Sequence, residues 1–172
     1  SISATFSTLG ARIVSLVIDG VDVVMGGGTD AEFLAGDWTT GIVCGRHAGR
    51  ITNSQFEIDG VTHKVLPTFG AHQLHGGPDN FGIRHWHHAA IDNGIRFTLV
   101  SPDGDQGFPG EVTVTADYVL KGSVLSLDMK AVTTKATVIN LTNHGYWNLL
   151  GAKSAFEHEM SIDADRYVVL ND

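Results

Sequence analysis

The stretch "TVINLTNHGYWNLLG", residues 137–151, places a histidine where it could transfer a proton. His144 is surrounded by asparagines and aromatic residues, and Asn143 and Tyr146 add an amide and a phenol within two positions of it. Histidine, with an ordinary pKa of about 6.5, holds or releases a proton near neutral pH. The segment otherwise predicts a buried strand that runs into a turn. His144 is therefore either a proton donor facing a ligand or a core histidine satisfied by its neighbours.

A second segment, "GAHQLHGGPDNFGIRHWHH" at residues 70–88, holds five of the nine histidines. Imidazole pairs suit zinc, copper or iron. However, no Cys, Asp or Glu follows at a familiar ligand spacing, so we expect no metal site. His75 precedes two glycines and a proline. This pattern predicts a histidine that is held at a sharp turn and pointed into a cleft.

A third candidate is "GRHAGRI", residues 45–51, in which two arginines flank small residues just before a predicted strand. The planar guanidinium fork of arginine can donate hydrogen bonds to hydroxyl or carboxylate groups. The alternative is an ion pair at the surface, and this stretch alone does not decide between them. The glycine-rich segment 101–110 predicts a pair of structural turns.

The elements that must position these residues are mainly β-strands. Asp-Gly or Asn-Gly pairs near residues 20, 60 and 94 join short apolar runs, which is typical of β-hairpins. Residues 111–120 and 124–132 alternate apolar and polar side chains, as strands with one buried face do. Only residues 30–36 suggest a helical turn, with Asp30 as a possible cap. We therefore expect one mainly β, antiparallel domain over residues 1–172.

Composition and charge disfavour several classes of partner. The net charge is -8, with only 11 Lys and Arg, so neither a nucleic acid nor an anionic membrane surface is an expected partner. No apolar run approaches the roughly 20 residues that span a bilayer, and no signal peptide is apparent. The single cysteine, Cys44, suits a reducing compartment, so we predict a cytoplasmic location.

In combination, these motifs resemble the aldose 1-epimerase (galactose mutarotase) family in order and spacing, over nearly the whole chain. The segments that carry the resemblance are "GRHAGRI", "LHGGP", "FGIRHW", "SPDGDQGFPG", "NLTNHGYWNL" and the strand-like "DADRYVVLND" at residues 163–172.

The resemblance implies a large antiparallel β-sandwich (the galactose mutarotase-like supersandwich). It also implies an isomerase that interconverts the α and β anomers of an aldohexose without cofactor or metal. A base takes the proton of the anomeric hydroxyl while an acid protonates the ring oxygen, and each such group is worth about 10²–10⁴ in rate. By motif match, His144 would be the general acid, and His75 would assist at the ring oxygen. Arg50 would hold sugar hydroxyls, with Tyr146 and Arg84 nearby.

This sequence also departs from the family pattern. Gly49 and His72 stand where the family usually has asparagine, and Gly145 where serine is common. Family members are about twice this length, and their glutamate base comes from the C-terminal half, so no residue here matches it. We therefore expect residues 1–172 to be the N-terminal part of a single sandwich domain. The C-terminal half of the same protein, or a second chain, would complete it.

Three other functions stay open at this point. A carbohydrate-binding or sugar-sensing protein would keep the cleft and lack the base. A histidine-metal β-sandwich enzyme would need a metal in stoichiometric amount. A hexose-6-phosphate epimerase would need a second arginine cluster, which the sequence does not show.

Overall fold

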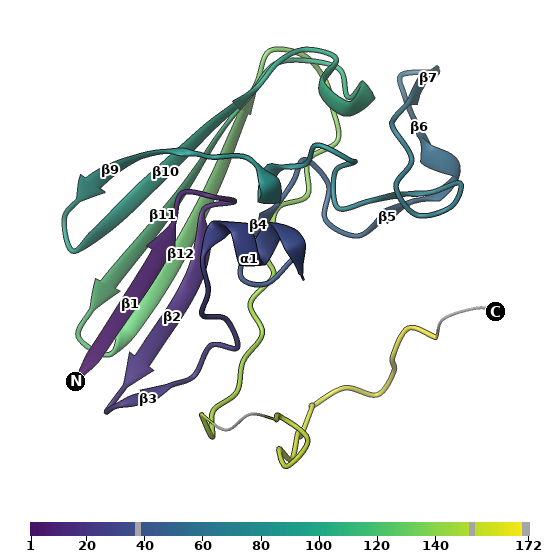
Figure 1. Cartoon of the computed structure of the whole chain (residues 1–172). Helices are drawn as coiled ribbons and strands as arrows, with labels where there is room; N and C mark the ends of the chain where they lie inside the picture. The colour runs from purple at the N-terminus through teal and green to yellow at the C-terminus, as the bar shows by residue number, and fades with distance from the viewer. Residues whose placement is uncertain (37–38, 152–153, 170–172) are drawn as a thin grey trace.

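The computed structural model describes residues 1–36, 39–151 and 154–169 (Figure 1). The described strands pair antiparallel in several sheets, and this confirms the mainly β, antiparallel architecture expected from the sequence. The strands are β1 Ile2–Ser7, β2 Arg12–Ile18, β3 Val21–Asp22, β4 Val43–Cys44, β5 Arg50–Ile51, β6 Gln55–Ile58, β7 Val61–Lys64, β8 Gln73–Leu74, β9 His87–Ile91, β10 Gly94–Ser101, β11 Val112–Lys121, β12 Val124–Thr133 and β13 Thr142–Asn143. The helices are α1 Asp30–Ala35 and the 3₁₀ turns Thr52–Ser54, Phe81–Ile83 and Asp105–Gly107.

The largest sheet has the strand order β12-β11-β10-β9 and forms one layer of the molecule (Figure 1). The two alternating stretches seen in the sequence are β11 and β12, paired from Val112↔Thr133 to Lys121↔Val124. On β11, every second side chain from Val112 to Tyr118 is buried, while Asp117 faces outward and binds Arg96 of β10. A period of two is what a sheet with one buried face requires, so the predicted faces are confirmed.

The main core lies against the inner face of this sheet and includes residues of β4 and of the segment around Phe81. Its central polar group is the Tyr118 hydroxyl, which donates to the Ala11 carbonyl at 2.9 Å and accepts from Asn143 Nδ2 at 3.1 Å. Burying one such aromatic side chain stabilises a fold by about 1.5–3 kcal/mol. The buried members are Ala11, Val43, Phe81, Trp86, Phe97, Leu99, Val112, Val114, Ala116 and Tyr118.

The three predicted hairpins are present as β2–β3, β6–β7 and β9–β10. In the first, Asp19 and Gly20 have φ of 48° and 87°. Positive φ at both central residues is the type I′ geometry, which matches the twist of the flanking strands.

The predicted helical turn at 30–36 is confirmed as α1, but its cap differs from the expectation. Thr29, not Asp30, is the N-cap: its hydroxyl accepts from the Glu32 N–H at 3.3 Å, and the Glu32 carboxylate accepts from the Thr29 N–H at 2.6 Å. This reciprocal capping box satisfies donors that a helix start leaves open. No helix within the described residues is long and apolar enough to cross a bilayer.

Two expected strands are not formed as predicted. Of residues 137–151, only Thr142–Asn143 is a strand, because its ladder with β4 is two residues long. Residues 163–169 are not a strand, and 170–172 lie outside the described residues. A strand needs a partner for its backbone donors and acceptors, and the described part of the chain pairs none with residues 163–169.

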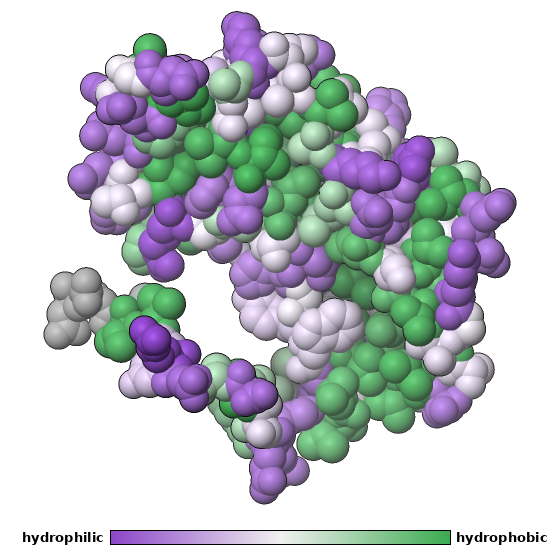
Figure 2. Space-filling view, turned by 180° about the vertical axis from the view of Figure 1, so that it is seen from behind, coloured by the Kyte–Doolittle hydropathy of each residue, from purple (hydrophilic) through white to green (hydrophobic). Residues whose placement is uncertain are grey.

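The final segment extends away from the body and carries exposed apolar side chains (Figures 1 and 2). Phe156 is 98% exposed, Tyr167 86% and Val168 92%. The largest sheet ends at β12, a ten-residue strand with no partner on its outer edge among the described residues. Large exposed apolar groups and long free edges mark surfaces that pair with another chain.

Candidate functional site

His144 directly follows β13, which holds its backbone rigidly. The His144 N–H donates to the Ile42 carbonyl at 2.8 Å, and the Gly41 N–H donates to the His144 carbonyl at 2.8 Å. The Asn143 side chain adds a bond to the Gly41 carbonyl at 2.9 Å and the bond to the buried Tyr118 hydroxyl. The half-buried imidazole is therefore presented from backbone that is tied to the core on both sides.

His75 stands at a sharp turn, as the sequence predicts. Its φ is 51°, and the following Gly76 and Gly77 have φ of 93° and 104°. Two reciprocal hydrogen bonds join it to Gly49: the His75 N–H donates to the Gly49 carbonyl at 3.0 Å, and the Gly49 N–H donates to His75 Nδ1 at 3.1 Å. Both the backbone and the ring of His75 are thereby oriented.

The fold brings His75 and His144 together in one cleft. Their ring centroids are 5.3 Å apart with the planes at 88°, and the Tyr146 ring lies 5.1 Å from that of His144. The Tyr146 hydroxyl is 3.3 Å from Thr39 Oγ1. The cleft has a volume of about 540 Å³. Its walls are formed by Ala48, Gly49, His75, Asn140, Leu141, Thr142, Asn143, His144 and Gly145.

Arg50 lies beside this cleft, one residue after the Gly49 that binds His75. It is exposed, and its guanidinium carbon stacks 4.8 Å from the centre of the Phe69 ring. Its strand β5 pairs with β8, which ends at Leu74, directly before His75. Its positive charge contributes to a lowered pKa at His75. The pairing of Arg50 with Leu74 therefore places this arginine near His75.

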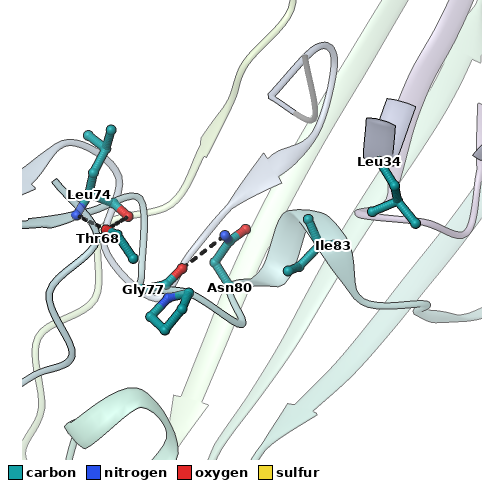
Figure 3. A pocket seen from close by; sticks show the side chains of 7 residues that line it. Leu34, Thr68, Leu74, Gly77, Asn80 and Ile83 are labelled. Atoms are coloured by element: carbon teal, nitrogen blue, oxygen red, sulfur yellow. Dashed lines mark hydrogen bonds between the residues drawn. The ribbon is translucent and has the colours of Figure 1, made fainter. Parts of the chain in front are cut away.

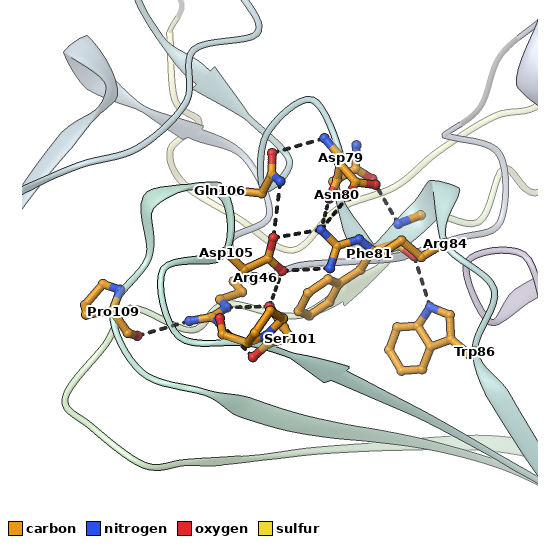
Figure 4. Close-up of polar contacts among 12 residues, drawn as sticks. Arg46, Asp79, Asn80, Phe81, Arg84, Trp86, Ser101, Asp105, Gln106 and Pro109 are labelled. Carbon is orange, nitrogen blue, oxygen red and sulfur yellow. Dashed lines mark hydrogen bonds and ion pairs between the residues drawn. The ribbon is translucent and has the colours of Figure 1, made fainter.

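Arg84 lies elsewhere, in a polar network under the glycine-rich turns (Figure 4). It donates two hydrogen bonds to the Asp105 carboxylate, at 2.7 and 2.8 Å, and one to the Asp79 carboxylate at 2.8 Å. Asp105 in turn accepts from the Ser101 hydroxyl. Arg84 does not line the cleft with His75 and His144, and its fork is engaged by two aspartates. The structure therefore does not bring this predicted residue together with the others.

Arg46, the other arginine of "GRHAGRI", is buried in the same network (Figure 4). It donates to the Ser101 hydroxyl at 2.9 Å and to the carbonyls of Ser101 at 2.9 Å, Pro102 at 2.7 Å and Pro109 at 3.0 Å. Burial lowers its pKa, although nearby aspartates oppose this. Residues 101–110 were predicted to form structural turns, and the buried Arg46 holds these turns by its hydrogen bonds.

Gly49 stands out in the sequence as a departure from the family pattern, but no residue type reveals that it contributes a backbone N–H to His75. Asn140 was not among the predicted site residues. Asn140 lines the cleft, and its side chain donates to the Ala48 carbonyl at 3.0 Å. Its position in the "NLTNHGYWNL" motif was the available signal.

A second pocket, of about 410 Å³, lies between α1 and the loop after β8 (Figure 3). Its walls are mainly apolar and include Leu34 and Ile83. The polar groups there bond to one another: Thr68 Oγ1 accepts from the Leu74 N–H at 2.8 Å, and Asn80 donates to the Gly77 carbonyl at 3.0 Å. Proton-transfer groups gather in the histidine cleft instead. Over the described ranges, no three His, Cys, Asp or Glu side chains assemble as metal ligands.

Stability is expected to fall as the pH drops below about 6.5. Burial is the first cause of a lowered pKa at both His47 and His75, and for His75 the positive charges of His144, Arg50 and His47 add to it. Because the pKa of these histidines is lower in the native state, the unfolded chain binds more protons than the native state at mildly acidic pH. Their contribution to stability is therefore complete above the pKa of the unfolded state and is lost as the pH falls through the pKa of the folded state.

Urea unfolding of the completed protein from about pH 7.5 to about pH 5.5 checks this prediction, because aspartates with lowered pKa lose their contributions only below about pH 4. The midpoint should decrease over this range. His75→Gln, which removes one of the two groups, should make the decrease shallower. A midpoint that rises on acidification would contradict the assignment.

Gly76→Ala is expected to be far more destabilising than Gly49→Ala. A Cβ at Gly76 would lie 1.9 Å from the Gly45 carbonyl oxygen, whereas at Gly49 it would meet nothing within 4 Å. Both positions have positive φ, which costs about 1–2 kcal/mol, and overpacking at Gly76 adds about 1–3 kcal/mol. Chemical denaturation of the two variants of the completed protein measures the difference. Equal losses would show that the close approach of Gly76 to Gly45 does not matter.

Comparison with known proteins relates this cleft to one family. The sequence model of the family described as aldose 1-epimerase matches residues 1–172. A galactose mutarotase from Sus scrofa is 39% identical over 153 residues, which are 88% of this chain and 45% of that protein. The aldose 1-epimerase of Escherichia coli (strain K12) is 40% identical over 135 residues, which are 77% of this chain and 39% of that protein.

Solved structures agree with the sequence relatives. An aldose epimerase homologue from C. elegans superposes with a TM-score of 0.82 at 31% identity, covering 88% of this chain and 49% of that one. A galactose 1-epimerase from Lactobacillus acidophilus gives 0.78 at 25% identity, covering 86% and 46%. The chain thus spans somewhat less than half the length of the curated relatives it matches. With a match along its whole length and the expected histidines in one cleft, the chain belongs to the aldose 1-epimerase family.

Proposed function

We propose that the protein containing this chain interconverts the α and β anomers of an aldohexose. The observation that carries the proposal is the edge-on pair of His75 and His144, two imidazoles with ring centroids 5.3 Å apart in an open cleft. Anomer exchange requires a proton donor at the ring oxygen, and imidazole suits that task near neutral pH. The names of the relatives support the same reaction.

In this proposal His144 protonates the ring oxygen while a base removes the proton of the anomeric hydroxyl. The ring opens, the aldehyde carbon rotates, and the ring closes on the other face with the proton roles reversed. Within the described residues, His144 makes ring contacts to His75 and Tyr146 and no side-chain hydrogen bond, so its nitrogens are available for transfer. His75 assists at the ring oxygen. Arg50 and Tyr146 bind hydroxyls, whereas Arg84 positions the turn at Asp105.

The base would come from outside residues 1–172. Among the described residues, no Asp or Glu lines the cleft. We propose that residues 1–172 are the N-terminal part of a single domain, completed by a C-terminal part of the same protein or by a second chain. The exposed Phe156, Tyr167 and Val168 and the free edge of β12 support this arrangement. Cooperative unfolding of the isolated 172 residues as a monomer would contradict it.

Polarimetry tests the reaction directly. The optical rotation of freshly dissolved α-D-galactose and α-D-glucose is followed with this chain, with the chain plus its completing part, and with buffer. Acceleration above buffer supports the proposal, and the ratio between the rates for the two sugars gives the substrate preference.

The single, buried Cys44 is the basis for proposing a cytoplasmic setting.

A second candidate is a carbohydrate-binding or sugar-sensing protein. The absence of a carboxylate from the residues lining the cleft favours it. Folded, completed protein that binds galactose in calorimetry but leaves the polarimetric rate at that of buffer would select this function instead.

A further inference from the structure

Gly49 lies where it can control the chemistry of one of the two cleft histidines. We propose that Gly49 is a positioning residue whose backbone N–H holds His75 as the tautomer with its proton on Nε2. His75 then acts as a permanent hydrogen-bond donor, and His144 alone transfers the proton. The division of roles between the two histidines rests on the proposed function, whereas the tautomer of His75 does not.

The geometry determines which nitrogen of His75 accepts. The Gly49 N–H donates to Nδ1 at 3.1 Å, and in a neutral imidazole only the nitrogen without a proton can accept. The proton of neutral His75 is therefore on Nε2. The second bond, from the His75 N–H to the Gly49 carbonyl at 3.0 Å, keeps the two residues in register.

The backbone at Gly49 explains why glycine suits this role. Its φ of 83° lies in the left-handed region, which glycine adopts without the Cβ penalty of other residues. In this conformation the N–H and the C=O of one residue both face His75. The position borders the cleft, and a Cβ there would meet open space. Conformation, not crowding, is what favours glycine here.

The charges around His75 act in the same direction. Burial and the positive charges of His144, Arg50 and His47 lower its pKa from the ordinary value, so the ring stays neutral at neutral pH. A protonated ring would carry a proton on Nδ1 and lose the bond from Gly49. Any sugar oxygen that binds the His75 ring must then accept a hydrogen bond from Nε2, and it cannot take a proton from it.

Nitrogen NMR of the ¹⁵N-labelled chain within the completed protein reads the tautomer directly. His75 is identified by the signals that disappear in His75→Gln. We expect an unprotonated Nδ1, a protonated Nε2 and a correlation across the hydrogen bond between the Gly49 amide and Nδ1, at pH 7. His72, whose Nδ1 accepts from the Asn53 N–H at 3.0 Å, is a matched internal control with the same tautomer. A protonated Nδ1, a mixture of tautomers or a charged ring at pH 7 overturns the proposal.

The division of roles has its own test in the completed, active protein. Glutamine retains an N–H near the position of Nε2, so His75→Gln should keep much of the activity that His75→Leu loses, about 10²–10³-fold for one donor. At position 144, glutamine should be no better than leucine. His75→Gln as inactive as His75→Leu overturns the donor role. If the tautomer is found but no preparation accelerates mutarotation, the proposed function fails while the role of Gly49 stands.

Discussion

Replacing His144 by glutamine is expected to lower the catalysed rate of mutarotation by about 10²–10⁴-fold, the contribution of one well-placed acid. Glutamine keeps a polar group of similar length but holds no proton that it can release near neutral pH. The backbone bonds of residue 144 to Gly41 and Ile42 do not involve the side chain. The variant should therefore fold like the parent, and the loss should fall mainly on kcat.

Polarimetry at saturating galactose measures this effect in the completed protein. His88→Gln, on the exposed strand β9, is the matched control, and its rate should equal that of the parent. Calorimetric binding of galactose to both variants separates a chemical loss from a binding loss. A His144→Gln protein with parental kcat would remove His144 from the mechanism.

Arg46→Met should give a large loss of stability, about 3–5 kcal/mol, because several acceptors lose a charged donor at about 1–3 kcal/mol for each buried group left unpaired. Methionine fills much of the volume but donates nothing to the Ser101, Pro102 and Pro109 carbonyls. A buried carbonyl left without its donor costs about 1–3 kcal/mol. This is a large fraction of the roughly 5–15 kcal/mol that stabilises a typical domain.

Urea unfolding of the completed protein at neutral pH measures the effect of Arg46→Met. The matched control is Arg96→Met, which removes a bidentate arginine from Asp117 on the solvent-facing side of the sheet and should change the midpoint little. Similar midpoints for the two variants would mean that the turns at 101–110 are held without Arg46.

Local patterns predicted the local structure well. The turn pairs at Asp19-Gly20 and Asp59-Gly60 and the alternation along β11 depend on neighbours in sequence, and all three are confirmed. The cap of α1 was wrong by one residue, because Thr29 and Glu32 together form a capping box that outcompetes Asp30. The strand expected within 137–151 shrank to two residues, because its partner β4 is only that long.

The candidate site was predictable only in part, because some of its features depend on contacts between residues that are not neighbours in sequence. His75 and His144 are bonded into turns by their own motifs, and the fold brings them into one cleft. The two arginines of "GRHAGRI" could not be told apart by type, yet Arg46 is buried and Arg50 is exposed. Arg84 carries the right chemistry, but Asp79, five residues away, and Asp105, twenty-one residues away, engage it. The residue type alone does not say whether an arginine faces a ligand or pairs with an aspartate of its own chain.

The two-residue ladder between β4 and β13 joins parts of the chain about a hundred positions apart, and Asn143 Nδ2 binds the Gly41 carbonyl across the same span. Closing so long a loop costs about 2 kcal/mol more than closing a ten-residue hairpin. During refolding, the β9–β12 meander should therefore gain hydrogen-exchange protection first, and the amides of Gly41 and His144 later. The ability to bind a ligand at the histidine cleft would then recover only when these later amides become protected, so its recovery would report the last step of folding.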